Sequence, residues 1–189
     1  MAYDYEKAKA AAQMMIEAIG HPLDDPNIAE TPDRVAKMNE IIYGGYNIDP
    51  KDHLKLFPSK NTDMVVERNI PFYSFCSHHQ LPFFGQITIA YLPGGQVLGL
   101  SKLVKIARCF IKRFQLQEDL TEQIATFIYE NVPDCRGAAV SIRAQHSCMI
   151  LRGVRAYGAE TITTKFLGEF TTQDLKNEFF MHLSNKEGY

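Results

Sequence analysis

Residues 64–100 read MVVERNIPFYSFCSHHQLPFFGQITIAYLPGGQVLGL. Within this stretch, Met64–Arg68 is rich in β-forming residues, and Gly85–Tyr91 alternates polar with apolar side chains. Such alternation is typical of a strand that buries one face. The Pro93–Gly95 run predicts a turn, and Gln96–Leu100 then predicts a returning strand. The centre of the chain therefore indicates antiparallel strands joined by short connections.

Helical patterns flank these strands. Tyr3–Ile19 is rich in Ala, Lys, Glu and Met, and a second helix is expected from Thr31, which can cap it, with Pro32 in the first helical position. We expect further helices over residues 101–114, 119–131 and 172–183, further strands over 137–149 and 161–170, and a connecting loop over 46–62. The order predicts an α+β fold: an N-terminal helical region (1–62), then an antiparallel sheet with a helix pair on one face (63–189), the two forming one functional unit.

Composition excludes several classes of protein. The chain has 189 residues, with 20 Lys and Arg against 22 Asp and Glu and a net charge of −2. This balance excludes a strongly basic nucleic-acid binder and an acidic disordered tail. No run of 18 apolar residues indicates a membrane span, and the first residues lack the apolar stretch of a signal peptide. We expect a cytoplasmic protein without a nucleic-acid or membrane partner.

Two short clusters contain residues that commonly bind metals. The first is Cys76-Ser77-His78-His79, and the second is His146-Ser147-Cys148. A Cys and a His separated by two residues can converge on one ion where the backbone turns between them. Residues i and i+2 of a strand share a face, so His146 and Cys148 are expected to point the same way, and Arg152 with them if the strand continues.

These clusters offer five candidates for at most four coordination places. We assign Cys76, His79 and Cys148 to the metal, with one place open, and leave His78 and His146 for proton transfer near neutral pH. The spacing does not force this division. A structural zinc with four protein ligands is one alternative, and Cys and His side chains packed in a core without a metal are another.

A strand-to-helix junction at Gly99-Leu100-Ser101-Lys102 indicates an anion site. Ser101 is suited to cap the helix, whose N-terminus would attract phosphate, and Lys102 and Lys105 begin a basic face. The alternative is an ordinary amphipathic helix with a solvated basic face.

Two further groups of polar residues are candidates for ligand binding. The carboxylate of Glu118, paired with the Gln117 amide, could read a base edge if buried, although both residues could simply be surface groups at a helix start. Arg34 and Arg152 are further candidate cations.

Several motifs occur in an order that resembles one known family. They are CSHH at 76–79, PFFG at 82–85, GLSKL at 99–103, QLQEDLT at 115–121, HSCM at 146–149 and RGV at 152–154. Together they resemble GTP cyclohydrolase I, and TPDRVAKM at 31–38 is similar to the early helix of that family. The resemblance covers residues 5 to 183, nearly the whole chain.

The resemblance implies a reaction and a site. The reaction is the zinc-dependent hydrolytic opening of the imidazole ring of GTP, which releases formate and gives 7,8-dihydroneopterin triphosphate for folate, pterin or deazapurine biosynthesis. It implies that Zn²⁺ is bound by Cys76, His79 and Cys148, and that His78 and His146 act as acid and base. The residues it implies for the substrate are Gln117 and Glu118 for guanine, and Arg34, Ser101, Lys102, Lys105 and Arg152 for the triphosphate.

The resemblance also implies the tunnelling fold (T-fold). In that fold, sheets from several subunits close into a barrel, so a homo-oligomer is expected, a decamer by analogy, with active sites at subunit interfaces. Three positions depart from the family pattern: Ser77 stands where Glu is frequent, Lys105 replaces an Arg, and Asp119 stands where a basic residue is frequent. At position 105 the charge is kept but bidentate geometry is lost.

Three rival functions remain for comparison. One is a tunnelling-fold relative that acts on another purine or a pterin, and another is a non-catalytic module stabilised by a four-ligand zinc. A zinc nucleobase deaminase is disfavoured because the chain lacks the His-x-Glu and Pro-Cys-x-x-Cys signature of those enzymes.

Overall fold

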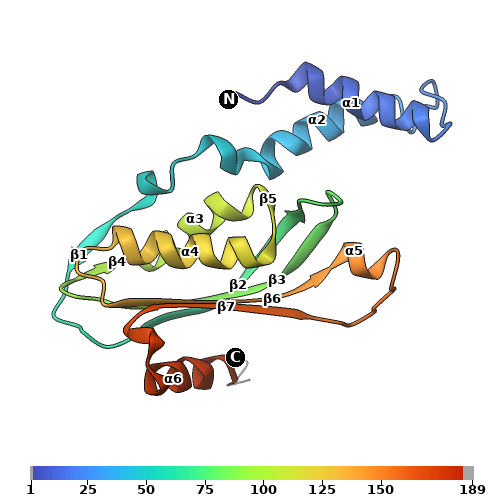
Figure 1. Ribbon diagram of the computed structural model, residues 1–189. Helices are drawn as coiled ribbons and strands as arrows, with labels where there is room; N and C mark the ends of the chain where they lie inside the picture. The colour runs from blue at the N-terminus through green and yellow to red at the C-terminus, as the bar shows by residue number, and fades with distance from the viewer. Residues whose placement is uncertain (1, 185–189) are drawn as a thin grey trace.

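The computed structural model describes residues 2–184 as a curled β-sheet with helices on both faces (Figure 1). The helices are α1 (Tyr5–Ala18), α2 (Thr31–Ile42), α3 (Leu100–Ile111), α4 (Gln117–Asn131), α5 (Ser147–Ile150) and α6 (Gln173–Ser184), with short 3₁₀ helices η1 (Gly44–Asn47), η2 (Pro50–His53) and η3 (Glu169–Thr171). The strands are β1 (Leu56–Pro58), β2 (Val65–Cys76), β3 (Pro82–Leu92), β4 (Gln96–Leu98), β5 (Phe114–Gln115), β6 (Gly137–His146) and β7 (Thr161–Gly168). The predicted α+β class is confirmed.

The main sheet has the strand order β5-β2-β3-β6-β7. Strands β2, β3, β6 and β7 pair antiparallel, as predicted for the sheet as a whole. The two-residue strand β5 pairs parallel to β2, so the sheet is mixed rather than purely antiparallel. Since β5 and β7 occupy its two edges, the sheet formed by residues 2–184 of one chain is open at both sides.

The strand predicted after the Pro93–Gly95 turn forms, but its partner lies elsewhere. Strand β4 pairs antiparallel with β1 in a separate two-stranded sheet, with Leu98 opposite Leu56. The expectation that residues 46–62 form only a connecting loop was therefore wrong, because this segment contains η2 and β1 as well as the end of η1.

The principal core lies between the main sheet and helices α3 and α4, which cover the same face of it (Figure 1). Ile87, Leu103 and Ile124 are fully buried there. Helix α6 packs on the opposite face, where Phe170 and Phe179 are fully buried. Because both faces are covered along β6, burial there is continuous rather than alternating.

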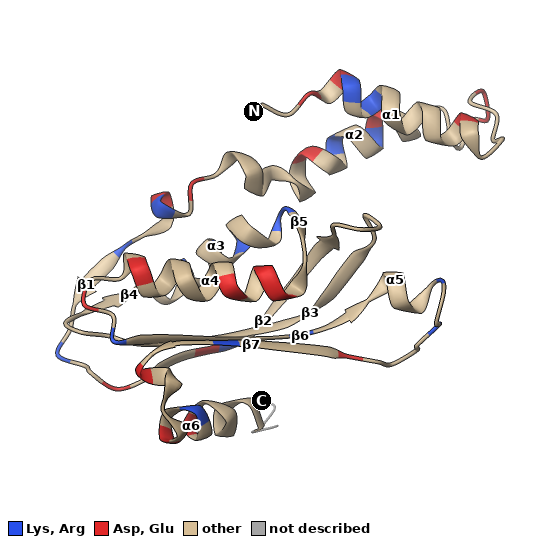
Figure 2. Ribbon diagram, viewed as in Figure 1, with Lys and Arg blue, Asp and Glu red and all other residues tan. Residues whose placement is uncertain are grey.

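The α1–α2 hairpin extends away from the sheet (Figure 1). Both signs of charge occur along the two helices (Figure 2), and Asp33 accepts ion pairs from Lys9 and Lys37 and a hydrogen bond from the Tyr5 hydroxyl. The hydrogen bond from Lys37 is the main reason that the pKa of Asp33 is lowered to about 2. Polar contacts thus join two helices that bury few side chains.

Both predicted caps were wrong. Helix α2 begins at Thr31, with Glu30 in the capping position and no side-chain cap. Helix α3 begins at Leu100 with Gly99 in the capping position, so Ser101 already lies in the first turn and makes no capping hydrogen bond. Among residues 2–184, no helix combines the length and apolar character that crossing a bilayer requires.

Candidate metal centre

The candidate site forms where three strands meet at one end of the sheet. Strand β2 ends at Cys76, β3 begins six residues later at Pro82, and β6 ends at His146. The register places Cys76 beside Gln115 of β5 and places Phe83 opposite His146. Segments 70 residues apart in sequence are therefore neighbours at this edge.

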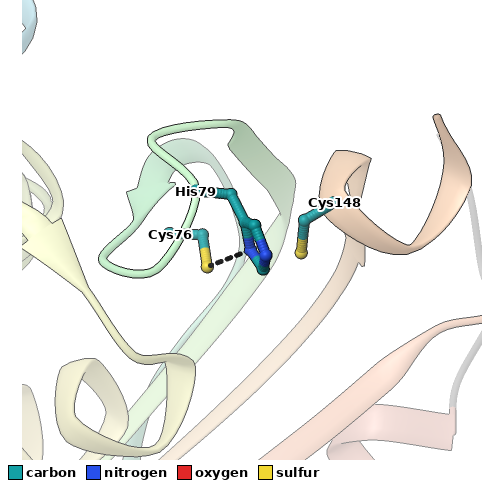
Figure 3. A group of neighbouring side chains, drawn as sticks. All are labelled: Cys76, His79 and Cys148. Atoms are coloured by element: carbon teal, nitrogen blue, oxygen red, sulfur yellow. Dashed lines mark hydrogen bonds between the residues drawn. The ribbon is translucent and has the colours of Figure 1, made fainter. Parts of the chain in front are cut away.

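Cys76, His79 and Cys148 converge as the sequence analysis predicted. Their ligand atoms all lie within 4.8 Å of one another, and the Cys76 Sγ is 4.0 Å from the His79 Nδ1 (Figure 3). Zn–S bonds of about 2.3 Å and Zn–N bonds of about 2.0 Å in a tetrahedral site place ligand atoms roughly 3.5–4 Å apart. The three side chains therefore fit zinc with little contraction.

The chemistry of this group also suits a soft divalent cation. Cys76 is buried, and Cys148 is half-buried beside it. Burial, together with the neighbouring Cys76 thiol, raises the pKa of the Cys148 thiol. Two thiolates this close repel each other, and a bound zinc ion would offset that repulsion.

Cys148 reaches the group from a different element than expected. Strand β6 ends at His146, and Cys148 lies in the short helix α5. The argument from strand parity was therefore wrong for both Cys148 and Arg152, although both residues do reach the site.

Arg152 contacts the outer nitrogen of His79. Its Nη1 lies 2.6 Å from the His79 Nε2. Arginine only donates hydrogen bonds, so Nε2 accepts and the ring proton lies on Nδ1, which faces the Cys76 sulfur. A metal on either ring nitrogen would leave Nε2 without a free lone pair. Metal binding at His79 and this Arg152 bond therefore exclude each other.

The two predicted proton-transfer histidines occupy different environments. His78 is exposed, with its Nδ1 4.0 Å from the Cys76 Sγ, but it is not part of the mutually close group. His146 stacks on Phe83, with ring centroids 4.6 Å apart, and its Nε2 lies 2.7 Å from the Gln117 Oε1. Burial lowers the pKa of His146 despite the nearby Glu118 carboxylate.

A cavity of about 240 Å³ lies beside the three candidate ligands. It is lined by six of the predicted residues: Cys76, His78, Gln117, Glu118, His146 and Cys148. Gln117 is buried, whereas Glu118 is exposed, so the condition of a buried Glu118 carboxylate is not met in the single chain. The cavity thus brings together thiols, imidazoles and a carboxylate.

Comparison with known proteins shows the family. The model of the GTP cyclohydrolase I family matches residues 8–184. The chain belongs to the GTP cyclohydrolase I family. The family resemblance inferred from the motifs is confirmed, and so is the conclusion that the chain is an enzyme of this kind.

Relatives named GTP cyclohydrolase 1 align with this chain over almost the whole length of both proteins. The protein of Clostridium perfringens strain 13 is 44% identical over 183 residues, covering 96% of this chain and 98% of the relative. The protein of Finegoldia magna is 46% identical over 179 residues, covering 94% of this chain and 97% of the relative. Among solved structures, the archaeosine synthase QueF-Like in the apo form aligns with a TM-score of 0.44 and 17% identity over 58% of this chain and 97% of its own.

Four of the residues predicted to bind the substrate lie away from both the cavity and the three candidate metal ligands. Ser101, Lys102 and Lys105 belong to the first half of α3, whose opposite end accepts a hydrogen bond at the Ile111 carbonyl from Ser74 of β2. Twelve helical residues span about 18 Å, so the start of α3 is remote from the Cys76 end of the sheet. Arg34 is exposed on α2, where it pairs with Glu30 at 2.7 Å.

The sequence analysis missed the residues that surround the Gln117 side chain at the candidate site. Thr121 and Thr163 hydrogen-bond with each other and with Gln117, and Thr161 lines the cavity. Alternation along residues 161–164 could have shown that Thr161 and Thr163 share one face of β7. No pattern indicated that this face meets α4.

Proposed function

We propose that this chain opens the imidazole ring of GTP by hydrolysis, releasing formate and giving 7,8-dihydroneopterin triphosphate. Zinc would be held by Cys76, His79 and Cys148. The observation that carries the proposal is the convergence of these three ligand atoms within 4.8 Å beside a cavity lined by two histidines and a carboxylate. Family membership supplies GTP as the substrate to test first.

The roles of the cavity residues follow from their chemistry. When bound, zinc supplies Lewis acidity that lowers the pKa of water toward about 7. His78 and His146 are within the same cavity and can move protons to and from the ring nitrogens of the base. The Glu118 carboxylate can accept two N–H bonds from the amidine edge of guanine. The residues present therefore suit both recognition and hydrolysis of a purine.

The size of the cavity suits a base better than a whole nucleotide. At about 240 Å³ it is smaller than the roughly 300–1,000 Å³ typical of small-molecule pockets. The triphosphate would then extend past the cavity, where Arg152 is the nearest predicted cation. One arginine is too little for about four negative charges, so further cations are needed.

A second copy of the chain would supply the further cations that the triphosphate needs. We propose that Ser101, Lys102 and Lys105, with Arg34, serve the site of a neighbouring subunit in a homo-oligomer. The open edges at β5 and β7 support this, because an unpaired edge can extend its hydrogen bonding to a strand of another chain. Closure of such sheets into a barrel, as a decamer by analogy, is part of the proposal.

The direct test is turnover of GTP. Purified protein with a measured zinc content would be incubated with GTP, and formate and the pterin, made fluorescent by oxidation, would be quantified. We expect both products in equal amounts, and neither from Cys148→Ser. Zinc-replete, folded protein that leaves GTP intact would overturn the proposal.

A further inference from the structure

The Gln117 side chain is held entirely by other residues of the chain. Gln117 is the first residue of α4 and only 2% exposed. Its Nε2 donates to the carbonyl oxygens of Ile142 at 3.1 Å and Thr161 at 3.0 Å, and lies 3.1 Å from the Thr163 hydroxyl. Its two amide hydrogens are therefore already used within the protein.

These partners decide which way the amide faces. Carbonyl oxygens only accept hydrogen bonds, so the NH₂ group must face Ile142 and Thr161. The Oε1 then faces His146, whose Nε2 lies 2.7 Å away. Because an amide oxygen also only accepts, the His146 Nε2 carries the proton. In the neutral ring, Nδ1 is left as the nitrogen with a free lone pair.

The hydroxyl groups of Thr121 and Thr163 support the same orientation of the Gln117 amide. Thr121 Oγ1 donates its one hydrogen to the Gln117 backbone carbonyl at 2.7 Å. Thr163 Oγ1, 2.6 Å from Thr121 Oγ1, must therefore donate to it, and its own oxygen stays available as an acceptor for Gln117. Every hydrogen bond in this network then has a single possible direction.

Packing fixes the plane of the His146 ring as well. The ring lies parallel to that of Phe83, with an interplanar angle of 2°, and Phe83 is fully buried. The hydrogen bond that His146 donates to Gln117 and the stacking on Phe83 together determine the tilt, the rotation and the tautomer of the imidazole.

We propose that Gln117 is a positioning residue that holds His146 with its proton on Nε2 and its lone pair on Nδ1. The relevance to catalysis rests on the proposed function, in which His146 moves protons. It follows that the Gln117 side chain does not read guanine, and that Glu118 provides the side-chain contact to the base. The predicted base-reading role of the Gln117 side chain is thereby replaced.

The first experiment observes the His146 proton directly. ¹⁵N-histidine-labelled, zinc-loaded protein at pH 8 should show a slowly exchanging, downfield Nε2–H signal that disappears in His146→Gln. We expect Gln117→Met, which keeps the volume but removes the acceptor, to abolish this protected signal. Its persistence in a folded Gln117→Met protein would overturn the proposal whether or not the protein turns over GTP.

A matched pair at Thr163 covers the case in which Gln117→Met fails to fold. Thr163 touches Gln117 but has no contact with His146 among the described hydrogen bonds. Thr163→Val, which removes the hydroxyl, should broaden or weaken the His146 signal, whereas Thr163→Ser should retain it. Equal effects of the two variants would contradict the network.

Kinetics separate positioning from base reading. Loss of a positioning partner should lower kcat for GTP by about 10–100-fold in Gln117→Met with little change in KM. Glu118→Gln, the neighbouring variant, should instead raise KM. A raised KM in Gln117→Met with unchanged kcat would show that its side chain reads the base.

Discussion

His79 and His146 keep their ring protons on opposite nitrogens. Arg152 donates to the Nε2 of His79, which leaves the proton on Nδ1, whereas His146 donates from Nε2 to Gln117. The difference comes from the partner: a guanidinium can only donate and an amide oxygen can only accept. In the proposed function these two arrangements suit different tasks: His79 would exchange its arginine partner for a metal, and His146 would transfer protons.

The exclusion between Arg152 and a metal at His79 leads to a prediction about Arg152→Ala. Metal binding must break the hydrogen bond from Arg152 to His79. The Arg152→Ala variant should therefore bind zinc as tightly as the wild type or more tightly. The freed guanidinium would contact phosphate, so GTP affinity should fall by about tenfold. Competition with a chromogenic chelator and equilibrium GTP binding measure the two effects.

Arg155→Ala provides the control for Arg152→Ala. Arg155 is exposed in the same segment but makes no described side-chain bond to His79. It should change neither zinc nor GTP affinity. Weaker zinc binding in Arg152→Ala alone would show that the arginine supports the metal site instead of competing with it.

Substitutions at the sulfur and imidazole groups test the division between ligands and proton donors. Cys148→Ser should lose stoichiometric zinc, whereas Cys135→Ser, at a thiol outside the cluster, should retain it. His78→Ala and His146→Ala should both keep zinc while kcat falls by about 100-fold or more. Metal analysis of each purified variant decides the matter, and zinc loss from His78→Ala would move His78 into the ligand set.

At the scale of the elements, the sequence predicted whether a segment is a helix or a strand better than it predicted which strands pair with each other. Alternation identified β3 and β6 because each has a period-two pattern along part of its length, but β4 pairs with β1 across 40 residues, which no local pattern encodes. Cys148 lies beside Cys76 and His79 as predicted, but it does so from the helical turn α5 and not from a strand, because β6 ends at His146. The site was therefore predictable from its ligand types, whereas its geometry depended on long-range packing.

The α1–α2 hairpin should loosen in acid. The pKa of Asp33 is lowered from 3.8 to about 2 by the hydrogen bond from Lys37 and, second, by that from Tyr5. A lowered carboxyl pKa stabilises the fold above 3.8, and the contribution is lost as the pH falls through about 2. Amide exchange in α1 should rise over this range in the wild type.

The variant Asp33→Asn isolates this contribution. Its α1 amides should already exchange faster at neutral pH and should show little further change with acid, while the amides of β3 stay protected in both proteins. Asp25→Asn, which removes a carboxylate from the loop before α2, is the matched control and should behave as the wild type. Identical exchange in Asp33→Asn and wild type at neutral pH would contradict a role for Asp33 in joining the helices.

At the scale of the whole molecule, the two ends of the main sheet have different chemistry. One end, where β2 and β6 terminate, has the thiols, imidazoles and Glu118. The start of α3, with Lys102 and Lys105, lies away from it in the same chain. A triphosphate attached to a base in the cavity extends only a limited distance, so an active site assembled from one chain would lack most of its cations. Two copies can provide both sets of groups at one interface.

Mixing two inactive variants tests such a shared site. Cys148→Ser removes a ligand from the metal end, and Lys102→Ala removes a cation from the α3 end, so each pure protein should be inactive. If a site draws the two residues from different subunits, co-refolded or co-expressed hybrids should regain up to about a quarter of wild-type activity, because random assembly brings two intact partners together at that frequency. Separately tagged variants purified through both tags would confine the assay to hybrids. Hybrids with no activity, formed by variants that still assemble with each other, would show that each chain completes its own site.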